Sequence, residues 1–269
     1  MNSNTKVRVA VAQFFVKPDC EGNLRTMIRF AERARRTRAN LLLMPECCLS
    51  GYPPVTGNRL TATAARQIES CLNRLKNVSR ELKLTMVFGS ARRSDEGWFN
   101  SAYVMRPGSV PLIYDKVHLV PGRDGDRPHF LPGKRFPTFR VAGKLCAALI
   151  CMDVRYPEPF RYLRSLGVKA VFMPFFVVGK NARWKLPVLE GTLRCRAAEN
   201  AFYVVAANVA GPHQAMLSRA CDPNGCSLGQ STLDAEDLFT VSLDLKSTSR
   251  FIYPGRRTDL FELRAKRSL

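Results

Sequence analysis

Three residues of chemically useful type stand at or near the ends of apolar segments. Glu46 ends the run LLLMPE, Lys116 lies within PLIYDKVHL, and Cys151 ends KLCAALIC. The ends of buried strands are where α/β folds place their functional sites. A carboxylate, an amine and a thiol gathered there could act as a general base, a stabiliser of a developing oxyanion and a nucleophile.

Each of the three residues also has an ordinary structural interpretation. Desolvation at the end of an apolar strand raises the pKa of a glutamate and makes Glu46 a usable base, but a strand-end glutamate can equally form a surface ion pair. A strand lysine such as Lys116 is more often simply exposed. Cys151 precedes a polar turn and a predicted helix, an elbow that exposes a nucleophile and favours its thiolate, although most single cysteines are buried and inert.

The composition is that of a globular protein. The chain has 269 residues, of which 46% are apolar and 24% are charged, and it contains no linker, internal repeat or low-complexity segment. Chains of this length often fold as one α/β unit. We therefore expect a single domain over residues 1–269.

The formal charge is +20, from 42 Lys and Arg against 22 Asp and Glu. A basic surface suits nucleic acid, an anionic membrane or an acidic substrate. No zinc-finger spacing, RNP-type aromatic signature or basic region running into heptads accompanies the charge, so nucleic acid is not the expected partner. The basic groups are spread along the chain and include Arg33, Arg35, Arg36, Arg38, Arg92, Arg93, Arg256, Arg257, Arg264, Lys266 and Arg267.

The nine cysteines and three histidines do not form a metal-binding pattern. There is no C-x-x-C spacing, so neither structural zinc nor another metal is expected. The N-terminal sequence MNSNTKVRVAVAQF has no signal-peptide core, and no run approaches the ~18 apolar residues of a membrane span. We expect a reduced, cytoplasmic protein whose thiols mostly pack in the core.

Hydrophobic periodicity predicts strands and helices that alternate at both ends of the chain, with a run of strands between them. This order favours sheets covered by helices over a simple open doubly wound sheet. The predicted strands are 7–14, 41–46, 85–91, 100–106, 111–118, 137–142, 144–151, 169–176, 202–209 and 238–245; the predicted helices are 22–38, 60–83, 157–166 and 183–200.

Three segments in order carry a family resemblance: MPE with GYP nearby, YDKVHL, and ICMDVRYPE. With these motifs the chain resembles the nitrilase (carbon–nitrogen hydrolase) superfamily, in particular its amidase-like branch. The segments RCRAAENAFYVVAANVAG (194–211), DPNG (222–225) and GRRTDLF (255–261) extend the resemblance over nearly the whole chain.

The resemblance implies an α/β fold, a four-layer α-β-β-α sandwich. It also implies a homodimer or larger homo-oligomer, built by packing the helices near 157–166 and 183–200 across a two-fold axis. Glu46 would be the general base, Lys116 the oxyanion stabiliser and Cys151 the nucleophile, with the backbone N–H of Met152 as second oxyanion donor. The implied substrate is a small amide, an ω-amide or an N-carbamoyl amine, cleaved through a thioester without metal or cofactor.

The chain departs from the family pattern after the lysine. Many members carry a second glutamate eight residues later, where this chain has Asp124. Either Asp124 acts from a shifted position, or Asp126 or neither residue does so. A misplaced carboxylate could cost about a hundredfold in rate, which leaves open an inactive scaffold that acts as an interaction protein and binds anionic polymers.

The pocket is the least determined part of the site. Tyr52, Phe175 and Phe176 are candidate wall residues, with core packing as the alternative for the two phenylalanines. Arg155 and Arg183 could bind a carboxylate on the substrate, or lie on the surface or at a subunit contact.

Overall fold

The computed structural model describes residues 5–246 and Arg257. The segment GRRTDLF (255–261), expected among the closing elements, lies outside the described residues except for Arg257.

The first sheet has six strands in the order β12-β1-β2-β3-β4-β5. Its centre is parallel, because β1 pairs with β2 and β2 with β3 in the same direction, while β12, β4 and β5 are antiparallel to their neighbours. The strands are β1 (Lys6–Gln13), β2 (Leu41–Leu43), β3 (Thr85–Arg93), β4 (Trp98–Met105), β5 (Leu112–Asp115) and β12 (Asp237–Asp244).

The second sheet has the order β11-β10-β9-β8-β7-β6, again with a parallel centre formed by β7, β8 and β9. Its strands are β6 (Thr138–Val141), β7 (Lys144–Ala148), β8 (Ala170–Pro174), β9 (Tyr203–Ala207), β10 (Arg219–Cys221) and β11 (Ser227–Gln230). The short strands β10 and β11 were not predicted from the sequence.

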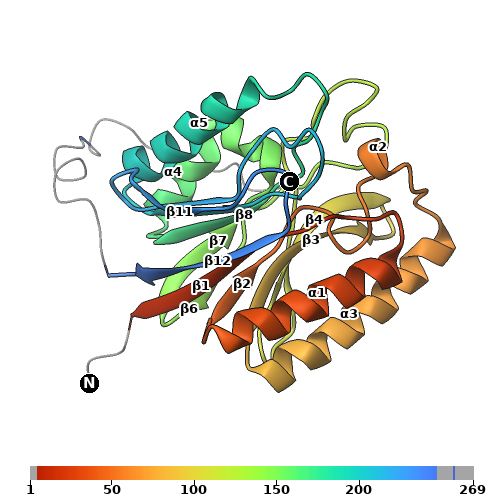
Figure 1. Cartoon of the computed structure of the whole chain (residues 1–269), viewed down its shortest axis with the longest axis horizontal. Coiled ribbons are helices and arrows are strands. Elements are labelled where there is room, and N and C mark those ends of the chain that lie inside the picture. The colour runs from red at the N-terminus through yellow and green to blue at the C-terminus, as the bar shows by residue number, and fades with distance from the viewer. Residues whose placement is uncertain (1–4, 247–256, 258–269) are drawn as a thin grey trace.

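Helices cover the outer face of each sheet. Figure 1 shows α1 (Cys20–Arg36) and α3 (Ala62–Leu82) side by side over the first sheet, with α4 (Pro157–Ser165) and α5 (Lys185–Asn200) over the second. The short helix α2 (Pro53–Thr56) lies at one end of the first layer. The expected four-layer α-β-β-α sandwich is thus confirmed.

Helix α1 illustrates how the sequence forms these layers. Asp19 caps it, accepting hydrogen bonds from the backbone N–H groups of Glu21 and Gly22, and three arginines in the last turn complement the helix dipole. Apolar residues at helical spacing face the sheet. The buried face consists of Leu24, Met27, Phe30, Ala31 and Ala34.

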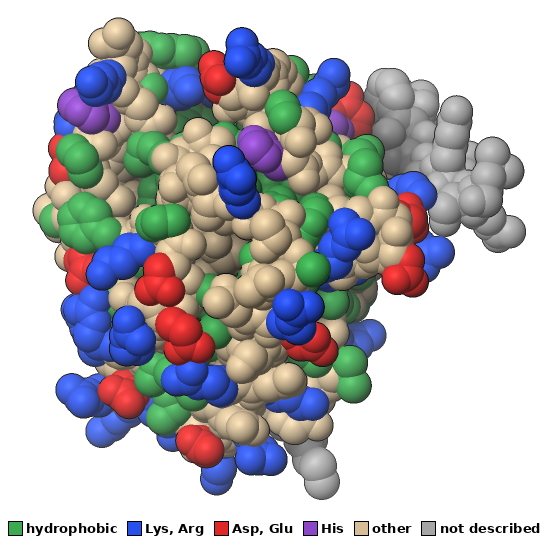
Figure 2. Space-filling model, turned by 90° about the vertical axis from the view of Figure 1, so that its right-hand side faces the viewer, with side chains coloured by type: hydrophobic (Ala, Val, Ile, Leu, Met, Phe, Trp, Pro, Cys, Tyr) green, Lys and Arg blue, Asp and Glu red, His purple; other side chains and the backbone are tan. Residues whose placement is uncertain are grey.

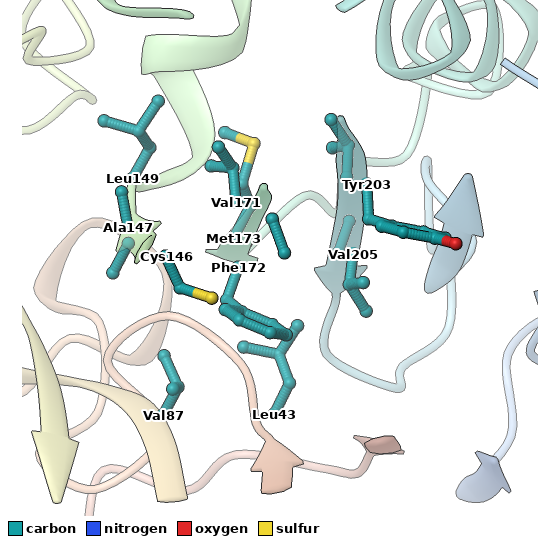
Figure 3. Packing of buried hydrophobic residues seen from close by; sticks show 14 of the residues in the cluster. Leu43, Val87, Cys146, Ala147, Leu149, Val171, Phe172, Met173, Tyr203 and Val205 are labelled. Atoms are coloured by element: carbon teal, nitrogen blue, oxygen red, sulfur yellow. The ribbon is translucent and has the colours of Figure 1, made fainter. Parts of the chain in front are cut away.

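Strand alternation separates two cores. In β2, Leu41 and Leu43 point between the sheets, whereas Leu42 points under helices α1 and α3. Figure 3 shows Leu43 and Val87 of the first sheet facing Phe172 and its neighbours on the second. The inter-sheet core therefore holds the two sheets face to face, and their strand ends lie beside one another.

Two surface properties are relevant to partners. On the face shown in Figure 2, Lys and Arg side chains lie among acidic, apolar and uncharged ones and do not form one continuous basic field. No helix in the described part of the chain is long and apolar enough to cross a membrane.

Candidate active site

Glu46 begins a turn three residues after β2 ends. Its backbone N–H donates to the carbonyl of Phe175, the residue after β8 of the other sheet (3.2 Å), and the carbonyl of the preceding Pro45 accepts from the N–H of Gly89 (2.9 Å). A Cβ on Gly89 would lie 2.3 Å from the nitrogen of Cys47 and 2.5 Å from the Cα of Glu46. Only glycine lets β3 approach the turn this closely.

Lys116 follows the last residue of β5, so the expected strand over 111–118 ends one residue before it. Its N–H still donates to the carbonyl of Asn100 on β4 (2.8 Å). The Nζ atom lies 2.7 Å from Glu46 Oε1 and 2.7 Å from Asp126 Oδ2, and all three side chains are fully buried. Lys116 is therefore bound between two carboxylates inside the protein.

Three further groups hold these carboxylates in place. Asn100 Nδ2 donates to Glu46 Oε1 (2.7 Å) and to Asp126 Oδ1 (3.3 Å). The Tyr52 hydroxyl also donates to Asp126 Oδ1 (3.0 Å), and the Val120 N–H donates to Asp126 Oδ2 (2.9 Å). With the ammonium of Lys116, they satisfy both oxygens of Asp126, as a buried carboxylate requires.

The second carboxylate of the site is Asp126 and not Asp124. Asp124 is exposed, whereas Asp126 is fully buried and contacts Lys116. The loop that follows Lys116 turns back on itself, and the N–H groups of His129 and Phe130 both donate to the carbonyl of Asp126. This turn brings the tenth residue after the lysine, and not the eighth, into the site.

The charges of the cluster set its protonation. Burial alone would lower the pKa of Lys116, but the neighbouring Glu46, Cys151 and Asp126 raise this pKa well above its usual value, so the amine stays an ammonium. Burial raises the pKa of Glu46; Lys116 opposes this rise and Asp126 adds to it. One ammonium is shared by two carboxylates, so it offsets only part of their negative charge. The pKa of Glu46 therefore stays raised, which suits this carboxylate to accept a proton.

Cys151 begins the 3-10 helix η1 (Cys151–Arg155) three residues after β7 ends. Its φ of 40° lies in the left-handed region, which is uncommon for a residue with a side chain. Burial and Glu46 raise the pKa of the thiol, while Lys116 and the backbone of Phe176 lower it. The net effect is a raised pKa, opposite in direction to the lowering expected from a helix N-terminus.

The arrangement therefore needs a base before the thiol can attack. Cys151 is close enough for the charges of Glu46 and Lys116 to affect its pKa, although it comes from the other sheet. Glu46 Oε2 is buried and has no hydrogen-bond partner among the described residues. A buried carboxylate oxygen without a partner among the described residues, in the same charge cluster as the thiol, is available to act as its general base.

The three candidate wall residues are all buried, but in different cores: Phe175 lies between the two sheets, whereas Tyr52 and Phe176 lie in the core under helices α1 and α3. The rings of Tyr52 and Phe176 lie 5.1 Å apart and both are nearly buried, with Phe176 also contributing its backbone near the Cys151 sulfur. Phe175 is fully buried in the inter-sheet core, so it is a packing residue and not a pocket wall.

The two candidate carboxylate-binding arginines are not alike. Arg183 forms an ion pair with Asp234, so its charge is already matched on the chain. Arg155 is partly exposed in η1, as is Met152, whose N–H was expected to be an oxyanion donor.

Sequence reasoning missed Asn100. It is a fully buried amide in the middle of the apolar strand β4 (WFNSAYVM), and it bridges the two carboxylates. A polar residue inside an apolar strand was the available signal. No group of three or more His, Cys, Asp or Glu in the described residues is arranged to hold a metal ion.

Comparisons with known proteins show which family the chain belongs to. A family model described as carbon–nitrogen hydrolase matches residues 8–253. An (R)-stereoselective amidase from Pseudomonas sp. is 33% identical over 211 residues, covering 77% of this chain and 73% of that protein. An omega-amidase from Mus musculus is 26% identical, covering 97% of this chain and 98% of that protein.

The solved structures point the same way. A mutant of the Nesterenkonia AN1 amidase, from the nitrilase superfamily, matches with a TM-score of 0.80 and 26% identity, covering 97% of each chain. The resemblance found in the sequence is confirmed, and the chain belongs to the carbon–nitrogen hydrolase family.

Proposed function

We propose that this carbon–nitrogen hydrolase cleaves a small amide through a thioester on Cys151, with Glu46 as general base and Lys116 as oxyanion donor. The observation that carries the proposal is the buried ammonium of Lys116, held 2.7 Å from Glu46 beside a thiol whose pKa both residues affect. Amide hydrolysis itself follows from the family and from the amidases among its relatives.

In the acylation half, Glu46 takes the proton from the thiol as the sulfur attacks the amide carbon. The carbonyl oxygen becomes an oxyanion, which accepts hydrogen bonds from the Lys116 ammonium and the Met152 N–H. The C–N bond then breaks, and Glu46 returns its proton to the departing nitrogen. Ammonia or an amine leaves, and the acyl group stays on Cys151 as a thioester.

In the deacylation half, Glu46 takes a proton from water, and the resulting hydroxide attacks the thioester carbon. The same donors stabilise the second oxyanion. The C–S bond breaks, the carboxylic acid leaves, and the proton on Glu46 restores the thiol. The sum is amide plus water to acid plus amine, and no redox change occurs.

The aromatic rings near the sulfur support one substrate class. The rings of Tyr52 and Phe176 are nearly buried, and the Tyr52 hydroxyl is bonded to Asp126, so the apolar surface of the rings suits a short aliphatic acyl group. The Nesterenkonia amidase has been solved with acrylamide and with butyramide. A short aliphatic amide is therefore the first candidate, with ω-amides and N-carbamoyl amines as the other two classes.

An inactive scaffold that binds anionic polymers is less consistent with the interior. Lys116, Glu46 and Asp126 are all fully buried. Removing an ion from water costs on the order of several kcal/mol, which only well-placed partners can offset. A scaffold without chemistry gains nothing from this cost, whereas a catalyst needs these charges.

Ammonia release tests the proposal directly. The panel would contain butyramide, acrylamide, an ω-amide of a dicarboxylic acid and an N-carbamoyl amine. We expect turnover of at least one member, lost in Cys151→Ser and kept in Cys226→Ser, which alters an exposed thiol elsewhere. Mass spectrometry should also find an acyl group on Cys151 when the reaction is quenched. Turnover that survives Cys151→Ser would overturn the mechanism.

A further inference from the structure

A third buried carboxylate, which does not contact Lys116, lies two residues after the proposed nucleophile. Asp153 is fully buried and accepts four hydrogen bonds. Its Oδ2 accepts from the N–H of Ile150 (2.8 Å) and from the hydroxyl of Tyr114 (2.7 Å). Its Oδ1 accepts from the N–H of His118 (3.1 Å) and lies 2.8 Å from His118 Nδ1.

In the sequence, these partners lie next to the two residues proposed to react. Ile150 immediately precedes Cys151, whereas Tyr114 and His118 lie two residues before and two residues after Lys116. The Tyr114 hydroxyl also accepts from the N–H of the residue after the lysine, at 3.2 Å. A single carboxylate therefore bonds to the chain on either side of the lysine and to the chain entering the nucleophile.

The two segments belong to different sheets. Tyr114 is on β5 of the first sheet, and the Cys151 elbow follows β7 of the second. Nothing in the geometry of either sheet alone sets the distance between them. The left-handed φ of Cys151 also requires support from its surroundings, and the Asp153 N–H donates back to the Ile150 carbonyl (3.0 Å) to close this turn.

We propose that Asp153 is a positioning residue that fixes the Cys151 thiol relative to the Lys116 ammonium, with His118 as its adjustable partner. The inference rests on the proposed function of these two groups. A displacement of about 1 Å between reacting groups can cost about a hundredfold in rate, so a bridge across the sheets at this point has a catalytic consequence.

His118 makes two separable contacts. In the tautomer with its proton on Nδ1, His118 donates to Asp153 Oδ1 at 2.8 Å. The imidazole also stacks on Tyr156, with ring centroids 4.2 Å apart, and its side chain is 27% exposed. A substitution at this partly exposed position can remove one contact and keep the other.

Two variants use this separation. His118→Asn places an amide nitrogen where Nδ1 was and keeps a donor to Asp153 but loses the stack. His118→Phe keeps the stack but loses the donor. His213→Asn is the control, because His213 is exposed and Asn tolerates its φ of 68°. Asp153→Asn removes the central charge and presents an amide N–H₂ to groups that are themselves donors.

The measurement is the rate of Cys151 alkylation by iodoacetamide, resolved by peptide mass spectrometry, together with kcat, KM and Tm. We expect His118→Phe to slow alkylation and kcat 10- to 100-fold with little change in KM or Tm. We expect His118→Asn to stay within about threefold of the wild type. Asp153→Asn should lose more than His118→Phe, and His213→Asn should lose nothing.

The outcomes separate the two proposals. If Cys151, which is partly exposed, reacts in the wild type no faster than the buried thiols, the proposed function fails and this inference fails with it. If the wild-type thiol is activated but His118→Phe matches it, the positioning role alone is overturned. A loss in His118→Asn without one in His118→Phe would assign the effect to the stack on Tyr156, and equal losses would assign it to the imidazole as a whole. Either outcome would overturn the positioning role of the hydrogen bond to Asp153. The His118 variants decide the question even if Asp153→Asn does not fold.

Discussion

Asp126 Oδ2 lies 2.7 Å from Lys116 Nζ, and neither side chain is exposed to solvent. This contact gives the lysine a second negative partner besides Glu46. It also explains how the ammonium persists in the interior, where an amine facing no charge would lose its proton. The carboxylate that holds the lysine is therefore a candidate for mutation as informative as the nucleophile itself.

Replacing this carboxylate should reduce catalysis strongly. In Asp126→Asn, the ammonium of Lys116 loses one of its two negatively charged partners. The new amide N–H₂ also faces the Tyr52 hydroxyl or the Val120 N–H, each of which is itself a donor. We expect kcat to fall about a hundredfold, the size of effect associated with misplaced reacting groups. The matched variant Asp124→Asn, at an exposed position, should keep kcat within about twofold. Equal effects of the two variants would contradict the assignment of Asp126.

The pH profile should show an acidic limb set by Glu46. Burial raises the pKa of this carboxyl above 4.5, and the base must be ionised to accept the thiol proton. Activity, measured as kcat/KM, should therefore fall as the pH drops through the raised pKa, by about tenfold per pH unit below it.

The thiol and the lysine should not limit activity on the acidic side. The pKa of Lys116 is raised above 10.5, so its charge is retained through neutral and mildly alkaline pH. In Glu46→Gln the acidic limb should disappear, and alkylation of Cys151 should rise only at high pH, as its raised thiol pKa requires. An unchanged acidic limb in this variant would assign it to another group.

Gly89 should be required both for stability and for the position of Glu46. Gly89→Ala places a methyl group 2.3 Å from the Cys47 nitrogen, which is backbone and cannot rotate away. Overpacking of this kind costs about 1–3 kcal/mol of unfolding free energy, and kcat should fall because the turn that carries Glu46 moves. Urea unfolding and kcat measure the two effects.

A second glycine serves as the control for this prediction. Gly191 lies at an exposed position of helix α5 with open space where its Cβ would be. Gly191→Ala should raise the unfolding free energy by about 1 kcal/mol, because alanine favours the helix. A loss of stability in Gly191→Ala, or none in Gly89→Ala, would contradict the steric argument.

The predicted homodimer or larger homo-oligomer can be tested at the surface around helices α4 and α5. The helices expected at the two-fold contact carry exposed apolar side chains: Val188 of α5 is 41% exposed, Trp184 just before α5 is 63% exposed, and Leu166 after α4 is 41% exposed. Analytical ultracentrifugation should find a dimer or larger species, and Val188→Asp should shift it toward the monomer. Leu228→Asp, equally exposed on β11, should not; a monomeric wild type would refute the prediction.

The sequence alone determined the fold class and the three groups proposed for catalysis. Nearly continuous β-branched and apolar runs such as 7–14 predict buried strands, and a chemically able residue at a strand end is visible as a local break in the pattern. Glu46, Lys116 and Cys151 could be found in this way because each lies beside its own apolar segment. Strand ends were less exact: Lys116 and Cys151 fall just beyond the strands they were assigned to.

Only the tertiary structure decided which other groups join them. Asn100, Asp126 and Asp153 act through hydrogen bonds to residues 10 to 54 positions away, and no local pattern encodes such distances. The loop after Lys116 could present Asp124 or Asp126, and its turn selects the second. Phe175 and Phe176 are adjacent in sequence but point to opposite sides, one into the inter-sheet core and one toward Tyr52. The physical reason is the same in each case: the site is assembled from two sheets, and packing fixes their relative position.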